Sequence, residues 1–164
     1  MFAVRALFAI ALVAASAETA SGAELAGFED LREEHWIRHV PDVFICDDEI
    51  PTEVVEVAMN FWRSRGANFG RLERHSECPE QPRFGVIAIY RDRGRAGEAY
   101  GVTARTVYNL EDGTRSTSIA YARVWIRSHY FDSTLLMKHE IGHAIGLGDL
   151  EASGHLMSRQ GPIY

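Results

Sequence analysis

The sequence predicts an α+β fold in a single domain. The chain has 164 residues, a length that fits one domain. Short apolar runs typical of strands occur together with two stretches in which apolar residues recur at helical spacing. Their order along the chain is strand, helix, several strands, helix. We therefore expect a mixed sheet that packs with its helices around one core.

The first residues are predicted to be a signal peptide. Within residues 1–23, the basic Arg5 precedes an apolar run that gives way to small residues. Cleavage is expected after Ala17 or Ala23, which leaves residues 24–164 as the domain. A buried N-terminal helix is the alternative, but the charged, apolar, small order disfavours it. The apolar run is too short to cross a bilayer, so we expect a secreted or periplasmic protein without a membrane anchor.

The charge pattern argues against a nucleic-acid partner. The formal net charge is -6, and acidic and basic residues are interspersed along the chain. Proteins that bind nucleic acids usually carry a basic patch or tract, and this sequence has none.

The first half of the domain is predicted to contain two strands around a helix. Residues 43–46 (VFIC) form a short apolar run and are expected to be a strand. Residues 51–64 have helical spacing and open on a proline, which suits the first helical position, while Gly66 suits the exit. Residues 84–90 (FGVIAIY) are almost continuously apolar, as in a central strand. The intervening residues 68–83 contain prolines and are expected to be a loop.

Two further strands are expected at residues 102–109 and 118–127, with a turn at residues 111–113. The second strand alternates in character, so its two sets of side chains should face opposite sides. The inward set is Ala122, Val124 and Ile126, and the outward set is Tyr121, Arg123, Trp125 and Arg127. The outward aromatic rings either line a groove or pack beneath a loop, and both interpretations stay open.

The last predicted helix follows a capping residue, either Asp132 or Ser133, and ends at Gly146 and Gly148. Its apolar side is expected to consist of Leu135, Leu136, Ile141, Ala144 and Ile145.

This helix carries the segment HEIGHAIGLGD, which has the spacing of a metal site. His139 and His143 are four residues apart, so their rings project from one helical face and converge. That arrangement suits two nitrogens bound to one zinc ion. Glu140 lies at the edge of the same face, where it can act as a base instead of a ligand. Gly146 permits a sharp turn that can bring Asp149 back as a third ligand.

The segment HEIGHAIGLGD, followed by GHLMS, resembles the metzincin zinc endopeptidases, whose pattern is HExxHxxGxxH and a methionine turn. It is most similar to the matrixins, and the aspartate in the last position resembles the snapalysin-type small secreted proteases. The resemblance implies His139, His143 and Asp149 as zinc ligands and Glu140 as general base. It implies Met157 as the methionine beneath the zinc. It also implies a zincin fold, with a twisted mixed sheet and an active-site helix.

The chain departs from the family pattern in several places. Arg159 stands where astacins and serralysins have a tyrosine ligand. Residues 91–103 (RDRGRAGEAYGVT) contain no counterpart of the matrixin loops that hold structural zinc and calcium. Few residues follow Met157, so the usual C-terminal helix is expected to be missing. His155 is the alternative third ligand, although it lies further along the chain than the family turn requires.

These features lead us to expect a secreted, monomeric zinc metalloendopeptidase that uses Zn²⁺ and a protein or peptide substrate. Zinc would activate a water, Glu140 would accept its proton, and an extended peptide would pair with an edge strand near residues 121–127. One alternative is a non-catalytic, zinc-stabilised binding or effector domain. The other is a metallohydrolase that acts on a non-peptide substrate.

Two cysteines, Cys46 and Cys78, are expected to form a disulfide, as is usual in exported proteins. The alternative is a thiolate that blocks the metal. Neither neighbouring segment, FICDDE or SECPEQ, resembles such a blocking motif.

Overall fold

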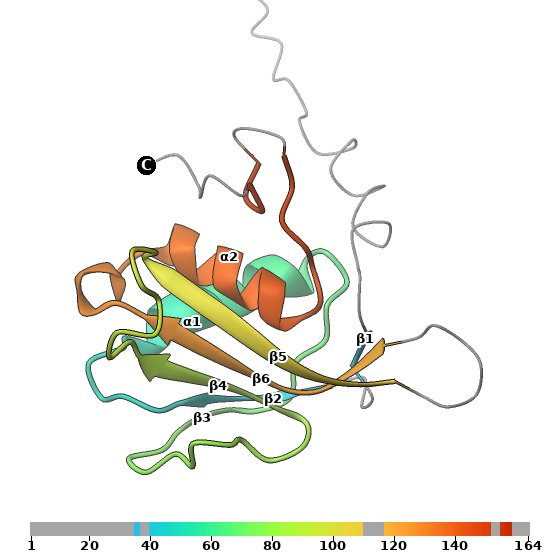
Figure 1. Cartoon of the computed structure of the whole chain (residues 1–164), viewed down its shortest axis with the longest axis horizontal. Helices are drawn as coiled ribbons and strands as arrows, with labels where there is room; N and C mark the ends of the chain where they lie inside the picture. Colours follow the sequence, from blue (N-terminus) through green and yellow to red (C-terminus); the bar gives the residue numbers. More distant parts are fainter. Residues whose placement is uncertain (1–34, 37–39, 110–116, 152–154, 159–164) are drawn as a thin grey trace, which may run out of the picture.

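The computed structural model describes residues 35–36, 40–109, 117–151 and 155–158 (Figure 1). Within these residues the strands are β1 (His35–Trp36), β2 (Asp42–Ile45), β3 (Leu72–Arg74), β4 (Val86–Arg91), β5 (Gly101–Asn109) and β6 (Thr117–Ile126). The helices are α1 (Thr52–Arg63), α2 (Thr134–Ala144) and a short 3₁₀ helix, η1 (Ser128–Tyr130). The predicted signal peptide, the turn at residues 111–113 and the predicted loss of a C-terminal helix lie outside the described residues.

The strands form one mixed sheet, which confirms the predicted α+β class. From one side, the order is β3, β2, β4, β6 and then β5, and β1 pairs with the first residues of β6. All pairs are parallel except that between β5 and β6, which is antiparallel. Figure 1 shows both α-helices on the same face of this sheet, with α2 running beside β5. The helices therefore cover one face of the sheet. The loop after β3 lies over part of the other face, where Tyr90 and Arg123 donate hydrogen bonds to its carbonyls.

The core lies between the sheet and the two helices. Alternate residues of the three inner strands have no exposed surface, and they are Val43, Ile45, Ile87, Ile89, Ala122, Val124 and Ile126. The last three confirm the predicted inward set of β6. The helix α1 contributes Val54, Val55, Ala58, Met59 and Trp62 to the same core. Burying each valine, isoleucine or methionine of this set completely is worth roughly 1.5–3 kcal/mol, and each alanine contributes less.

Two buried tryptophan side chains donate hydrogen bonds to backbone carbonyls of α2. Trp62 of α1 donates Nε1–H to the carbonyl of Lys138 at 2.7 Å. Trp36 of β1 donates Nε1–H to the carbonyl of Ala144 at 3.2 Å. Ser133 caps the start of the helix, because its hydroxyl accepts a hydrogen bond from the Leu136 amide at 3.2 Å. The helix is thus held at its start, middle and end, and of the two predicted caps Ser133 is correct.

The prediction that residues 121–127 form the edge strand is wrong. The strand β6 is an inner strand, because β4 pairs along one side of it and β5 along the other. Within the described residues, β5 has β6 as its one strand partner and forms the edge beside α2. A hairpin can place either of its strands at the edge, and here a parallel pairing with β4 makes the second strand internal.

Three local expectations also change. Pro51 is the residue before α1 instead of its first residue, and Gly66 forms the expected turn after the helix with φ 93°. The stretch expected to be a loop contains the short strand β3, which extends the sheet beyond β2. Trp125 does face outward, but it is only 8% exposed, since it stacks on Tyr90 at a centroid distance of 6.1 Å. Both open interpretations apply to this ring in part, because the Arg95 guanidinium of the loop after β4 lies over it at 5.2 Å and the ring also lines a hollow beside the disulfide.

The predicted disulfide between Cys46 and Cys78 is present, with Cα atoms 5.5 Å apart. It joins the end of β2 to the loop that follows β3. Among the described residues, no helix has the length and apolar character that crossing a bilayer requires.

Candidate metal centre

The two histidines of α2 converge as their spacing predicts. His139 and His143 lie one helical turn apart, and their Nε2 atoms are 3.0 Å from each other. His139 is buried and His143 is partly buried, so both rings are held by the surrounding structure. Two ring nitrogens that point at the same small space make a site for one shared cation.

The partners of the other ring nitrogens determine which nitrogen of each ring is free. His139 Nδ1 lies 2.7 Å from the Leu156 carbonyl, and His143 Nδ1 lies 3.0 Å from the Leu147 carbonyl. A carbonyl oxygen only accepts, so each Nδ1 must carry the hydrogen. The two Nε2 atoms of the neutral rings therefore face each other with lone pairs. This contact is repulsive unless a proton or a metal cation lies between them. Nδ1–carbonyl bonds are the usual support for metal-bound histidines.

Asp149 reaches the same space because the chain turns sharply after α2. Gly146 has φ 105°, a left-handed conformation that other residues rarely adopt. Asp149 Oδ1 then lies 3.3 Å from His143 Nε2. One ligand atom from each of His139, His143 and Asp149 lies within 4.8 Å of the others, so these three residues could hold a metal ion. The turn predicted from Gly146 is present, and it places the carboxylate beside both rings.

His155, the alternative third ligand, is not part of this group. Its Nδ1 accepts a hydrogen bond from the Met157 amide at 3.1 Å, within a local turn. The segment that contains His155 is bonded to the turn after α2, because the Leu150 amide donates to the Met157 carbonyl at 2.7 Å. Met157 itself is only 1% exposed. A Cβ placed on Gly142 would lie 2.5 Å from Met157 Sδ, so this glycine lets the methionine pack against α2.

Glu140 is buried next to the three residues of the group. Only 4% of it is exposed, and Thr103 of β5 donates its hydroxyl to Glu140 Oε2 at 2.6 Å. The other carboxylate oxygen lies against Gly101, where a Cβ would approach to 2.8 Å. Burial raises the pKa of the Glu140 carboxyl above its ordinary value, the Thr103 hydrogen bond and His139 oppose that rise, and Asp149 adds to it. A carboxylate held in this way is suited to exchange a proton.

Arg105 of β5 connects the edge strand to the end of α2. Its Nη1 donates to the carbonyls of His143 and Leu147 at 2.9 and 3.1 Å. These carbonyls lie where the helix ends and its last acceptors need donors.

An open pocket of about 590 Å³ lies between β5 and this end of α2. Its lining combines the edge strand with the candidate ligands and consists of Gly101, Val102, Thr103, Arg105, Val107, His139, Glu140, His143, Gly148 and Asp149. The pocket is therefore bordered by both Glu140 and the two histidines of the converging group.

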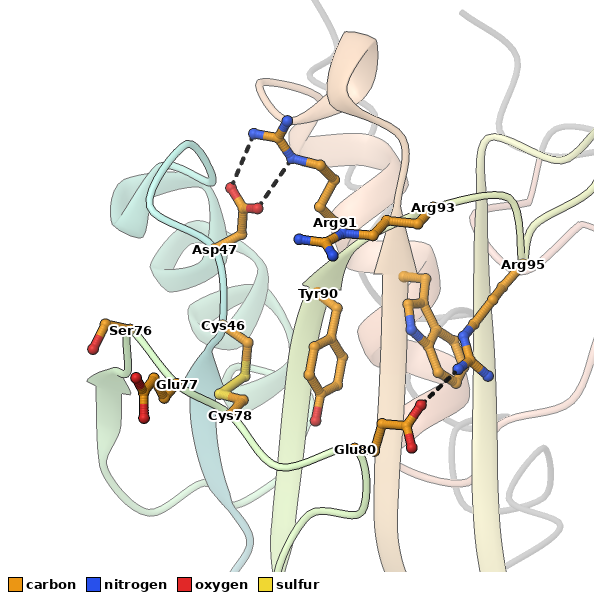
Figure 2. Close-up of a pocket in the computed structure, with 11 residues that line it drawn as sticks. Cys46, Asp47, Ser76, Glu77, Cys78, Glu80, Tyr90, Arg91, Arg93 and Arg95 are labelled. Atoms are coloured by element: carbon orange, nitrogen blue, oxygen red, sulfur yellow. Dashed lines mark hydrogen bonds and ion pairs between the residues drawn. A yellow bond between two sulfur atoms is a disulfide. The ribbon is translucent and has the colours of Figure 1, made fainter.

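A second hollow, of about 410 Å³, lies beside the disulfide on the loop-covered face of the sheet (Figure 2). Most of its charged side chains pair with one another: Asp47 with Arg91 at 3.0 Å, and Glu80 with Arg95 at 3.4 Å. Tyr90 donates its hydroxyl to the Pro79 carbonyl. Exposed ion pairs of this kind contribute little to stability. In contrast to the first pocket, the residues that line this hollow are not part of the described group that could hold a metal ion.

The structure brings together all four site residues predicted from the sequence, and it adds Thr103 and Arg105. Sequence reasoning missed these two, although both are polar and alternate on a strand that was predicted. Alternation shows that they share a face. It does not show that this face meets α2. Comparison with known proteins adds no relative, since no family model matches the chain and a search of curated proteins found no significant match.

Proposed function

We propose that this protein is a secreted zinc-dependent metalloendopeptidase of the metzincin type. The observation that carries the proposal is the convergence of His139 Nε2, His143 Nε2 and Asp149 beside the buried carboxylate of Glu140. Two imidazoles and one carboxylate are a usual set for catalytic zinc, which keeps a fourth position for water or substrate. A purely structural site would usually have a fourth protein ligand, and it would have no use for Glu140.

A zinc ion bound to these residues would polarise the scissile carbonyl and acidify a water at neutral pH. Glu140 would accept a proton from the attacking water and deliver it to the nitrogen of the leaving amine. The Thr103 hydroxyl holds the carboxylate in place and favours its charged form. The two Nδ1–carbonyl bonds fix the histidine tautomers. The open edge of β5 would position an extended peptide across the pocket by backbone hydrogen bonds.

Cleavage of a quenched fluorescent peptide library by the mature protein tests this proposal. We expect cleavage that a zinc chelator stops and added Zn²⁺ restores, with one zinc per chain by elemental analysis. Glu140→Gln keeps the shape of the side chain and the three ligands, so it should retain zinc. Its activity should fall by at least about a hundredfold, because general base catalysis is lost.

The matched control is Glu56→Gln, which makes the same change at an exposed position of α1. It should cleave as the unmodified protein does. One zinc per chain without cleavage of any peptide would contradict the proposal and favour the non-catalytic zinc-stabilised domain. Near-normal turnover by Glu140→Gln would refute the assigned base.

A further inference from the structure

We infer that Arg105 is a positioning residue that holds His143 and the turn to Asp149 in the geometry that a metal requires. This inference rests on the proposed function, since it assumes that these residues bind a metal ion. Arg105 belongs to β5, opposite Ala122 of β6, so the sheet fixes its backbone independently of α2. One guanidinium nitrogen reaches two carbonyls, those of His143 and Leu147.

The Leu147 carbonyl is the point at which this contact acts on the metal site. It accepts from Arg105 Nη1 at 3.1 Å and from His143 Nδ1 at 3.0 Å. Arg105 therefore fixes the acceptor that orients the His143 ring. The same two carbonyls flank Gly146, whose positive φ starts the turn toward Asp149. Loss of the guanidinium would free the acceptor and the turn together.

His139 is held by a different part of the chain. Its Nδ1 donates to the Leu156 carbonyl, next to the buried Met157. The candidate site thus has two supports from different parts of the chain, one for His139 and one shared by His143 and Asp149. Removal of Arg105 should leave the first intact and loosen the second.

The two possible roles of Arg105, as a charge and as a positioning residue, predict opposite changes in metal affinity when the guanidinium is removed. Arg105 lines the same pocket as the three candidate ligands. If Arg105 acted only through its charge, its removal would lower the repulsion of a cation and raise metal affinity. If Arg105 positions the ligands, its removal should lower metal affinity, as the loss of an outer support usually does. The direction of the change therefore distinguishes the two roles.

The experiment compares Arg105→Met, Arg105→Lys and the control Arg93→Met in the mature protein. Arg93 is exposed and lines the hollow on the opposite face, so its substitution removes the same charge far from the site. Zn²⁺ affinity is measured by competition with a chelator. The visible absorption of bound Co²⁺ at saturation reports the ligand geometry, with Asp149→Ala as the reference for a lost ligand.

We expect Zn²⁺ affinity to fall about 10–100-fold in Arg105→Met and to be partly restored in Arg105→Lys. The Co²⁺ spectrum of Arg105→Met should shift toward that of Asp149→Ala, which a general loss of stability would not cause. Arg93→Met should match the unmodified protein in both measurements.

Unchanged or higher affinity in Arg105→Met would overturn the positioning role and leave the proposed function standing. If Arg105→Met fails to fold, Arg105→Gln takes its place, because it also removes the charge and is too short to span to both carbonyls; an affinity equal to or above that of the unmodified protein would then refute the inference. If the unmodified protein binds neither Zn²⁺ nor Co²⁺, the proposed function itself fails.

Discussion

Asp149 and His155 compete for the place beside the two histidines of α2. Asp149 lies 3.3 Å from His143 Nε2, whereas the Nδ1 atom of His155 is occupied by the Met157 amide. Substituting a residue that only supports a metal ligand typically lowers affinity roughly 10–100-fold. Asp149→Ala removes a ligand itself, so we predict a larger loss of Zn²⁺ affinity. His155→Ala should leave the affinity close to normal. Competition against a chelator measures both.

The two alanine variants control for each other, since each removes one potential ligand from the same segment. If His155→Ala loses the metal and Asp149→Ala keeps it, the third ligand has been misassigned. The protein could then still be a zinc protease, but the likeness to snapalysin-type enzymes would be lost.

Glu140 has a second measurable consequence, in the stability of the metal-free protein. Its pKa is raised from 4.5 by burial, so the native state binds the proton more tightly than the unfolded state. The free energy of unfolding must then decrease as the pH rises through 4.5 toward the raised pKa. Glu140→Gln does not titrate. We predict that it becomes progressively more stable than the unmodified protein over this window, and that the difference is constant above it.

Denaturant unfolding of both proteins at a series of pH values, with chelator present, tests this prediction. A difference that does not change with pH would show that the carboxyl is not disfavoured as an ion in the folded protein. If Glu140→Gln raises the free energy of unfolding and lowers the activity, the Glu140 carboxylate serves catalysis and destabilises the folded protein.

A close contact at Gly142 links α2 to the core. A Cβ there would lie 2.5 Å from Met157 Sδ and 2.8 Å from Trp62 Cζ2. Alanine normally stabilises a helix relative to glycine, by about 0.5–1 kcal/mol. Overpacking costs more, so we predict that Gly142→Ala destabilises the metal-free protein by about 1–3 kcal/mol.

Chemical denaturation measures the effect, with Glu56→Ala as the control for a new alanine at an exposed helical position of α1. The control should change stability by less than about 0.5 kcal/mol. A stabilised Gly142→Ala would mean that the methionine and the indole can move aside without loss.

The elements of this fold differ in how far the sequence predicts them. The strand β4 and the helix α2 were predictable, because apolar runs and helical spacing report burial directly. The strand β3 was missed because LER contains a single apolar residue, and its pairing with β2 depends on backbone contacts that leave little mark on side chains. The edge position of β5 was missed for a related reason, since only the pairing of β6 with β4 decides it.

The candidate site also contains residues that the local sequence predicts and residues that only the packing of separate elements determines. The residues of the motif lie close together in sequence, so helical geometry and one glycine turn predict their convergence. Thr103 and Arg105 reach the site from a separate strand. Their contribution depends on how the sheet and α2 pack, which the pattern of either element alone does not specify.

At the scale of the whole molecule, the assembled fold places a strand edge beside the converging ligands, and this arrangement leads to a prediction about the substrate. From Gly101 to Thr106, before the register shift between Thr106 and Val107, the residues of β5 alternate in direction, so every second residue turns its N–H and C=O groups away from β6. A peptide that pairs there must offer its own backbone groups at alternate positions. A peptide that is N-methylated at two of those positions loses two N–H donors to β5, each with a net worth of roughly 0.5–1.5 kcal/mol. Its kcat/KM should therefore fall about tenfold. N-methylation at the intervening positions should have little effect.

Two peptide series with identical side chains, methylated at odd or at even positions around the cleaved bond, measure the difference. Equal cleavage of both series would exclude pairing with β5, whereas cleavage of neither the modified nor the unmodified peptides would count against the protease itself.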